Sequence, residues 1–251
     1  MVSRSLNNLG RLLLVVLVAL AASGTVFAAP DYKKLKDEIP KLEKNVSDAR
    51  SAQSDADSKL NENRKAQKTA TGAALNALKS EGVKLAKAAG EKADKLAEAE
   101  QQLANKQGEL RGAAAKYAVS QLSAAGKLDV RVVEANHALD DWDGALGKLP
   151  AVPSLRSLEG IVDPQEQKAI RKQDKVQLQA YDAWGNAEEK RIDTEIKQAQ
   201  QLIDAEEKLR NADDGKLLVD TAKELKTTLE KRKSEVQKLR KTAKTRLDSI
   251  D

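Results

Sequence analysis

The chain contains no cysteine and very few aromatic side chains. Its 251 residues include no Cys, and Phe, Trp and Tyr together make up 2% of them. The lack of Cys excludes disulfide bonds and thiolate metal sites, and it leaves the redox compartment open. Because aromatic side chains fill most large cores and many ligand pockets, their scarcity argues against a large compact core.

The residues that are abundant favour helices. Charged residues make up 33% of the chain, and Ala, Leu and Gln account for much of the rest. This composition is typical of long helices and coiled coils. We therefore predict an all-α, elongated fold, built as an antiparallel coiled coil or as helical hairpins with long helices.

Residues 1–28 have the pattern of a secretory signal peptide. Arg4 and Arg11 precede an apolar run at residues 12–22, and small residues around Ala28 fit a cleavage site. The alternative is an uncleaved membrane anchor, but the apolar run is shorter than the ~20 residues that span a bilayer. We predict cleavage and a periplasmic or secreted location, which argues against a nucleic-acid partner.

Residues 31–149 are predicted to be a long-helix or coiled-coil region. Apolar residues recur in steps of three and four from Leu35 onward, and at strict sevens from Leu96 to Tyr117. Such spacing forms the seam of a coiled coil. Because proline fits the first position of a helix, we expect the regular helix to begin at Pro40.

Two breaks divide this region. Residues 61–68 are polar on all sides and Gly72 follows them, which leaves open whether residues 31–125 form one long helix or a hairpin. Gly126 is predicted to end the second stretch. A shorter helix is then predicted over residues 128–149.

Three prolines mark a linker at residues 150–164. Pro150, Pro153 and Pro164 disfavour a continuous helix, and we take this segment as the boundary between two halves. The C-terminal half, residues 165–251, is predicted to be an antiparallel helical hairpin.

The hairpin prediction depends on a capped helix start and a turn. Asp163 and Pro164 fit the N-cap and the first position of a helix, which we expect to run to about Arg210. The sequence NADDG at residues 211–215 is typical of a tight turn, with Gly215 able to adopt a positive φ. A nearly unbroken heptad pattern of apolar residues follows the turn.

The sequence offers little for catalysis or metal binding. His137 is the only histidine, and no phosphate-binding loop, nucleophile elbow or zinc motif occurs. The acidic stretches at 139–144 and 210–215 do not place oxygen ligands at the positions of a calcium-binding loop. No carboxylate is expected in an apolar context that would shift its pKa. We predict no catalytic residue, no cofactor, no metal and no small-molecule substrate, and a protein that is not an enzyme.

Three large aromatic residues form a candidate junction patch between the two halves: Trp142, Tyr181 and Trp184. They are predicted to fill the place where helices of unequal length meet, because Ala and Leu would leave gaps there. A small ligand-binding patch is the alternative.

The last predicted helix carries a run of basic residues. Residues 231–246 include eight basic residues and one acid, Glu235. The simpler interpretation is a solvated helix face, partly paired with the acidic stretch at 187–214. The alternative is an interaction surface for anionic lipid headgroups or envelope polymers. The candidates, expected to project away from the apolar seam, are Lys231, Arg232, Lys233, Lys238, Arg240, Lys241, Lys244 and Arg246.

These features together favour an exported, periplasmic bacterial scaffold, spacer or adaptor. It is expected to contact other helical proteins or itself, as an oligomer, because the long seams have too little core to form a globule. One alternative is a holdase-type chaperone with basic helical arms, although the chain lacks the Met and aromatic surface that such a cradle needs. Another is a peripheral binder of anionic envelope lipids or polymers.

Overall fold

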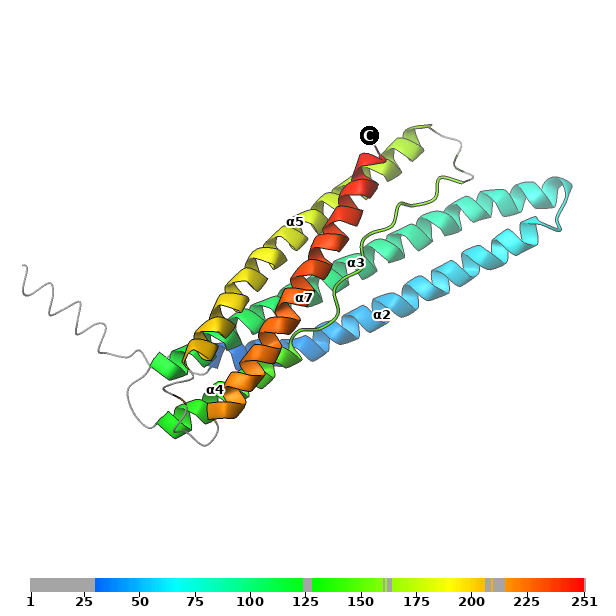
Figure 1. Ribbon diagram of the computed structural model, residues 1–251. Helices are drawn as coiled ribbons and strands as arrows, with labels where there is room; N and C mark the ends of the chain where they lie inside the picture. The colour runs from blue at the N-terminus through cyan, green and yellow to red at the C-terminus, as the bar shows by residue number, and fades with distance from the viewer. Residues whose placement is uncertain are drawn as a thin grey trace, which may run out of the picture.

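The computed structural model describes residues 30–123, 128–159, 161, 164–205, 209 and 215–250. These residues form helices and irregular segments, with no strand among them. The helices are α2 (Pro30–Gln67), α3 (Gly72–Ser123), α4 (Leu128–Gly144), α5 (Pro164–Asp204) and α7 (Gly215–Asp248) (Figure 1). The predicted all-α fold of helical hairpins with long helices is confirmed.

Helices α2 and α3 form the first hairpin. Arg50 of α2 pairs with Glu100 of α3 at 2.9 Å, and Glu38 of α2 pairs with Lys106 of α3 at 3.1 Å, so the two helices are antiparallel. Gly72 adopts φ +57° at the start of α3, a conformation that glycine reaches without steric cost. The alternative of a single long helix through this region is thereby excluded.

Helices α5 and α7 form the second hairpin. Lys226 of α7 donates to Gln200 of α5 at 2.8 Å, and Arg240 pairs with Asp182 at 2.9 Å, so residue numbers rise along α7 as they fall along α5. Helix α5 begins at Pro164, as the sequence predicts. The C-terminal part of the molecule is therefore an antiparallel hairpin.

The two hairpins share a core at the end of the molecule where α4 lies, which we call the base. Helix α4 packs against α3 and α7, and α3 packs against α5. Figure 1 shows the hairpins together at the base and diverging toward the other end, which we call the distal end. The buried residues of this core include Leu110, Ala114, Val132, Leu139, Trp142, Ile192, Leu202, Leu218, Leu225 and Leu229.

An irregular segment, residues 147–159, runs from α4 toward the distal end between the two hairpins (Figure 1). We call it the strap. Tyr181 donates its hydroxyl proton to the carbonyl oxygen of Pro150 at 2.7 Å, and Arg246 donates to that of Pro153 at 2.7 Å. The backbone carbonyl groups of the strap have no helical partners, because the segment is irregular. Side chains of α5 and α7 donate hydrogen bonds to them instead. The strap overlaps the predicted linker at residues 150–159, and the two prolines in this overlap, Pro150 and Pro153, are buried.

Three predicted helix boundaries are wrong. Helix α2 continues through Pro40 instead of beginning there. Pro40 has no N–H to bond to the carbonyl group of Lys36, but both residues are exposed, so water can bind that carbonyl group. Helix α4 ends at Gly144, and Leu149, where its end was expected, contacts the core from irregular chain. Helix α5 ends at Asp204 and not near Arg210. Apolar spacing misplaced the end of α4 because irregular residues also pack against the core.

Some sequence predictions concern residues outside the described ranges, namely the signal peptide at 1–28, Gly126, Asp163 and the turn residues 211–214. Gly215 is described as the first residue of α7, and it does not adopt the positive φ that we expected. A Cβ at this position would lie 2.1 Å from the carbonyl oxygen of Leu209. The glycine therefore permits a close backbone approach rather than a left-handed turn.

Two adjacent leucines of α7 test the packing of this helix. Leu218 is completely buried, whereas Leu217 is 59% exposed. We expect Leu218→Ala to lower the free energy of unfolding by about 2–5 kcal/mol, because it removes buried methyl groups and leaves a cavity. Leu217→Ala is the matched control and should change it by less than about 0.5 kcal/mol. Urea denaturation followed by circular dichroism measures both, and equal losses would contradict the orientation of α7.

Candidate functional site

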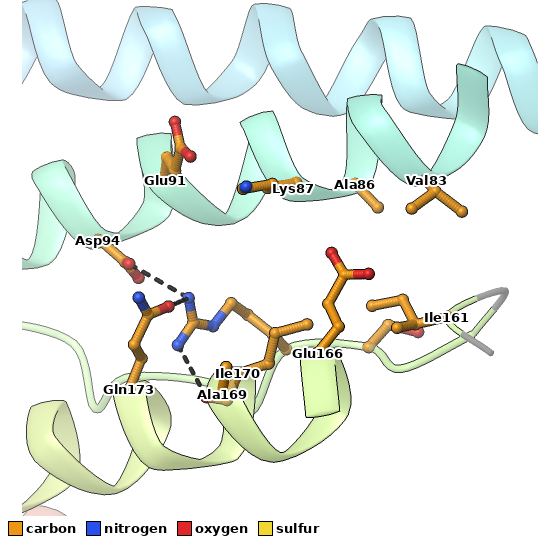
Figure 2. Close-up of a pocket in the computed structure, with 12 residues that line it drawn as sticks. Val83, Ala86, Lys87, Glu91, Asp94, Ile161, Glu166, Ala169, Ile170 and Gln173 are labelled. Carbon is orange, nitrogen blue, oxygen red and sulfur yellow. Dashed lines mark hydrogen bonds and ion pairs between the residues drawn. The ribbon is translucent and has the colours of Figure 1, made fainter. Parts of the chain in front are cut away.

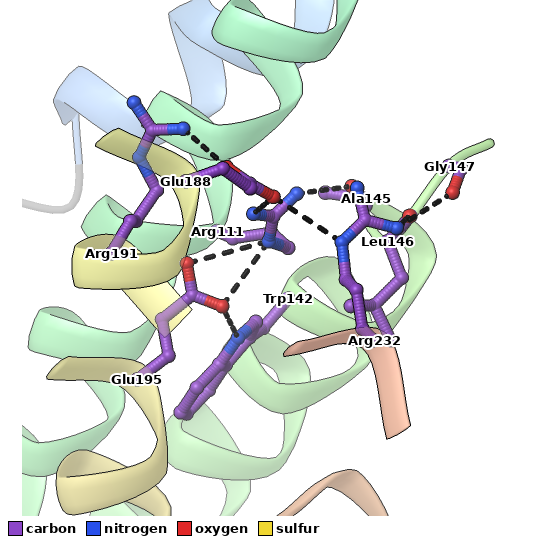
Figure 3. Close-up of polar contacts among 9 residues, drawn as sticks. All are labelled: Arg111, Trp142, Ala145, Leu146, Gly147, Glu188, Arg191, Glu195 and Arg232. Atoms are coloured by element: carbon purple, nitrogen blue, oxygen red, sulfur yellow. Dashed lines mark hydrogen bonds and ion pairs between the residues drawn. The ribbon is translucent and has the colours of Figure 1, made fainter. Parts of the chain in front are cut away.

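Two arginine and two glutamate side chains lie inside the base, where the two hairpins meet. Arg111 comes from α3, Glu188 and Glu195 from α5, and Arg232 from α7 (Figure 3). The exposed fractions of these side chains are 0%, 0%, 1% and 8%. We call these four residues the charge cluster.

Arg111 lies at the centre of the charge cluster. Its Nε is 3.1 Å from Oε2 of Glu195, and its Nη2 donates to Oε1 of Glu188. Arg232 donates from Nε to the same Glu188 oxygen at 3.2 Å, and from Nη1 to the carbonyl oxygen of Gly147 at 2.9 Å. Glu188 thus binds arginines from two different helices, and one of these also binds the start of the strap.

Trp142 and Arg191 complete the surroundings of the two glutamates. Trp142 of α4 donates its indole N–H to Oε2 of Glu195 at 3.2 Å. Arg191 is 25% exposed and donates to the second oxygen of Glu188 at 2.6 Å. Figure 3 shows the guanidinium group of Arg191 on one side of Glu188 and those of Arg111 and Arg232 on the other. Every carboxylate oxygen of the charge cluster therefore accepts a hydrogen bond.

The hydrogen bonds to all four carboxylate oxygens help to explain why these charges can be buried, although Nη2 of Arg232 is a buried donor without a partner among the described residues. Transfer of a carboxylate and a guanidinium from water to the interior costs several kcal/mol per ion, and their attraction offsets this cost only when the remaining donors and acceptors are satisfied. An alternative register of α5 against α3 would leave a buried charge without a partner. The charge cluster therefore selects one register of the two hairpins more than it adds net stability.

The pKa values of the two buried glutamates shift in opposite directions. Burial alone would raise the pKa of Glu188, but the guanidinium groups of Arg111, Arg232 and Arg191 lower that pKa below its usual value. Burial raises the pKa of Glu195 above its usual value, because Arg111 offsets the burial only in part and the charge of Glu188 adds repulsion. Glu195 is therefore the member of the pair that binds a proton first on acidification.

A cleft of about 210 Å³ lies toward the distal end, between α3, the strap and α5 (Figure 2). Arg156 of the strap lines it and is tied to both helices. It donates to Asp174 at 2.6 Å and to Gln173 at 2.7 Å on α5, and to Asp94 on α3 at 3.3 Å. Arg156 therefore links α3 to α5 across the strap.

The walls of this cleft carry polar and charged side chains as well as apolar ones. The apolar part includes Val83 and Ala86 of α3, Ile161, and Ile170 of α5. Figure 2 shows the carboxylate of Glu166 pointing from the first turn of α5 into the space toward α3. A second cleft of about 530 Å³ near the turn between α2 and α3 shares Val83 and Ala86 with the first. We call the two clefts together the distal groove, which is lined by both apolar and charged side chains.

Half of the basic candidates on α7 are bound within the fold. Arg232 belongs to the charge cluster, so the expectation that all eight project outward is wrong for this residue. Lys233 pairs with Asp193 at 2.6 Å, and Arg240 pairs with Glu189. These carboxylates belong to the acidic stretch of α5, so part of the expected internal pairing is present.

The remaining basic candidates differ by residue type. Arg246 binds the strap, as described above. The other four are exposed and form no ion pair with any residue that the structure describes: Lys231, Lys238, Lys241 and Lys244.

The three aromatic candidates are buried and do not form one patch. Tyr181 and Trp184 pack together with a distance of 5.2 Å between ring centroids, in a cluster that includes Leu178. Trp142 belongs to the core of the base. Their burial leaves no open patch for a ligand at these side chains.

The sequence analysis missed the charge cluster, and its expectation that no carboxylate has a shifted pKa is wrong. A signal was present in the spacing. Glu188 and Glu195 follow Tyr181 at strict sevens along the buried face of α5, and Arg232 interrupts the apolar seam of α7. A charged residue at a seam position becomes buried when the helices pack together.

The described ranges hold few other features that bear on chemistry. His137 is exposed on α4. No group of three or more His, Asp or Glu side chains in these ranges could hold a metal ion. None of the described helices is both long enough and apolar enough to cross a bilayer.

No family model, curated protein or solved structure matches this chain. Function therefore has to be inferred from the sequence pattern and from the geometry above.

Replacement of each buried glutamate by glutamine tests the charge cluster. At neutral pH we expect Glu188→Gln to lower the free energy of unfolding by about 3–5 kcal/mol, because the buried guanidinium groups lose the anion that they share. Glu195→Gln makes the same chemical change on the same face of α5. Its loss should be smaller, because folding already disfavours the charged form of Glu195. Urea denaturation followed by circular dichroism measures both values.

The two variants should also differ in pH dependence. The folded pKa of Glu195 is raised, so its carboxylate lowers stability as pH rises from the ordinary value of 4.5 through the folded value. The stability deficit of Glu195→Gln relative to the wild type should therefore shrink as pH rises through that window. The folded pKa of Glu188 is lowered, so its contribution disappears as pH falls from 4.5 through the folded value, and the deficit of Glu188→Gln should shrink there. Deficits independent of pH would contradict both assignments.

Proposed function

We propose that this chain is an exported, non-catalytic helical scaffold or adaptor of the periplasm that works through contacts with other helical proteins. The observation that carries the proposal is the divergence of the two hairpins from their shared base (Figure 1). Diverging arms present long surfaces to partners while the base holds their relative positions. The signal-peptide pattern of residues 1–28 supports export.

The distal parts of α2 and α3 support this proposal because their apolar seam is only partly covered. Leu60 of α2 and Leu75, Leu78 and Leu85 of α3 are half-buried, although they lie on the seam between the two helices. Burial of the remaining apolar surface would contribute about 25 cal/mol per Å². A partner helix laid along the arm would therefore gain hydrophobic contact that two helices alone do not supply.

The distal groove offers a place for such a helix. Its rim carries both signs of charge, with Arg64 and Lys79 from the first hairpin and Glu159 and Glu166 from the other side. Arg64 lies 3.5 Å from Glu159 and so links the arm to the strap. Mixed charges around apolar walls suit the apolar face of an amphipathic helix with charges of both signs.

The location of the charge cluster supports a non-catalytic role. A general acid or base has to come within about 3 Å of the proton that it transfers, directly or through one water. Glu188 and Glu195 have no appreciable exposed surface, and arginine or tryptophan donors occupy their oxygens. In the proposed scaffold these charges fix one hairpin against the other.

The absence of Cys allows a position-specific test of the distal groove. Ser80→Cys places a single thiol in the groove, and Ser58→Cys places one on an exposed position of α2 outside it. Each variant is labelled with benzophenone maleimide and irradiated in an extract of its native cell envelope. We expect discrete cross-linked products from Ser80→Cys and few from Ser58→Cys, because only the first thiol would face a bound partner.

The masses of the cross-linked products separate the two kinds of partner. A product of twice the chain mass indicates self-assembly, and any other discrete mass indicates a different protein. Equal labelling from the two positions, or no product from Ser80→Cys, would contradict the groove as a partner site.

Export is tested by the mass and location of the mature chain. In the native cell we expect a chain that begins at Ala29 and is recovered from the envelope fraction, because the residues around Ala28 suit signal peptidase. Ala28→Arg should block cleavage and cause the longer precursor to accumulate. Recovery of uncleaved wild-type chain from the cytoplasm would contradict the export proposal.

A further inference from the structure

Between residues 231 and 246 the arginines of α7 are bound within the fold, and all the lysines except Lys233 are not. Arg232, Arg240 and Arg246 are hydrogen-bonded to α5 and to the strap. This separation follows from chemistry, because the planar guanidinium forms several fixed hydrogen bonds whereas the ammonium of lysine is strongly hydrated. Four exposed lysines of residues 231–246 form no ion pair within the described ranges, and we call them the lysine stripe: Lys231, Lys238, Lys241 and Lys244.

The lysine stripe follows the outward side of α7. Steps of seven, three and three residues keep its members within less than half of the helix circumference, over a length of about 20 Å. Two threonines beside the lysines, Thr242 and Thr245, donate their hydroxyl protons to backbone carbonyl oxygens at 3.2 Å and 3.1 Å. The exposed positions from 231 to 246 are Lys, Ser, Thr, Gln and the single acid Glu235. This surface is therefore positive and carries no large apolar side chain.

The opposite side of α7 holds the stripe in place. Val236 and Ala243 are buried against the rest of the fold, and Arg240 is bound to α5 between them in sequence. The backbone that carries the lysines is consequently fixed before any partner arrives. Binding would then cost the ordering of the lysine side chains but not of the helix.

We propose that the lysine stripe is a peripheral docking surface for the anionic headgroups of a phospholipid membrane. The shared phosphate charge of many headgroups matches several separate ammonium groups spread along a straight rod. The stripe lacks the apolar side chains that would insert below the headgroups. Contact would therefore be electrostatic and parallel to the membrane surface.

The chemistry of the stripe favours a membrane over a nucleic acid. Single strands are bound by aromatic side chains on which bases stack, and the exposed positions listed above include none. Base-specific contacts to a duplex use bidentate arginines, and the arginines of this segment are engaged in the fold. A membrane requires neither feature.

The proposal goes beyond the scaffold function, and the two do not depend on each other. None of the four lysines lines the clefts of the distal groove. A chain that fails to bind membranes could still bind a helical partner, and the cross-linking test above would still report it.

The size of the effect can be estimated from the charge. One lysine close to an anionic membrane surface increases the partition coefficient about five-fold. Loss of the whole stripe should therefore lower it by at least about 100-fold. Because the lysines are exposed, salt should weaken the interaction as the Debye length falls from about 10 Å at 0.1 M to about 3 Å at 1 M.

The test uses the chain without residues 1–28 and sedimentation with large vesicles. One set of vesicles is equimolar phosphatidylcholine and phosphatidylglycerol, and the other is phosphatidylcholine alone. The stripe variant replaces all four lysines by Gln. Its matched control replaces four exposed lysines of the first hairpin by Gln, which gives the same change in net charge: Lys44, Lys59, Lys65 and Lys84.

We expect salt-sensitive sedimentation of the wild type with the anionic vesicles alone. The stripe variant should lose at least about 100-fold in partition coefficient, whereas the control variant should lose much less, and Glu235→Gln should gain about five-fold. Circular dichroism should show the same helix content in all variants, because every substituted residue is exposed.

Equal losses for the stripe and control variants would overturn the proposal, because net charge rather than the stripe would then govern binding. Binding to soluble polyphosphate without binding to anionic vesicles would also overturn it, in favour of a polyanion ligand. Binding to phosphatidylcholine that persists in high salt would contradict an electrostatic contact.

Discussion

The ion pair between Arg111 and Glu188 is the contact on which the placement of the two hairpins depends. Each hairpin can form from its own seam of Leu and Ala, and such seams tolerate sliding because the same spacing recurs along the helix. A buried guanidinium group prevents such sliding. If the helices slid, it would lose its carboxylate partner in the protein interior, where water cannot take the place of that partner. Arg232 extends the constraint to α7 and to the start of the strap. Four segments that are distant in sequence are fixed by one cluster.

The molecule therefore combines a closed base with an open distal end. Apolar residues of α3, α4, α5 and α7 enclose the charge cluster at the base, whereas the distal ends of the hairpins are joined through the strap and Arg156. Of the two surfaces proposed for partners, the distal groove lies between α3, the strap and α5, and the lysine stripe lies on the outward side of α7.

The second hairpin was predictable from the sequence because its signals are local, whereas the sequence left open whether residues 31–125 form a hairpin or one long helix. Pro164 marks a helix start, and the spacing of Leu and Ala marks the faces that become buried. The charge cluster was not predictable in the same way, because a third of the chain is charged and only the meeting of specific faces decides which charges are buried. Glu188 and Arg232 could have been suspected from their seam positions, but their pairing requires a relation between α5 and α7 that spacing alone does not supply. Pro40 is a case in which a strong local signal was misleading, because it predicted a helix start and α2 instead continues through this exposed position.

The hydrogen bonds of the strap impose an order on assembly. Helices α2 and α3 adjoin each other in sequence and can close as soon as both exist, because their contacts require only a short loop. The donors that bind the strap come later, and Arg246 lies 93 residues beyond the carbonyl group that it binds at Pro153. As the chain emerges from its N-terminal end, the strap cannot acquire its final partners until the last turns of α7 are present. The contacts of the first hairpin are local in sequence, whereas the contacts that join the two arms require α7 to be nearly complete.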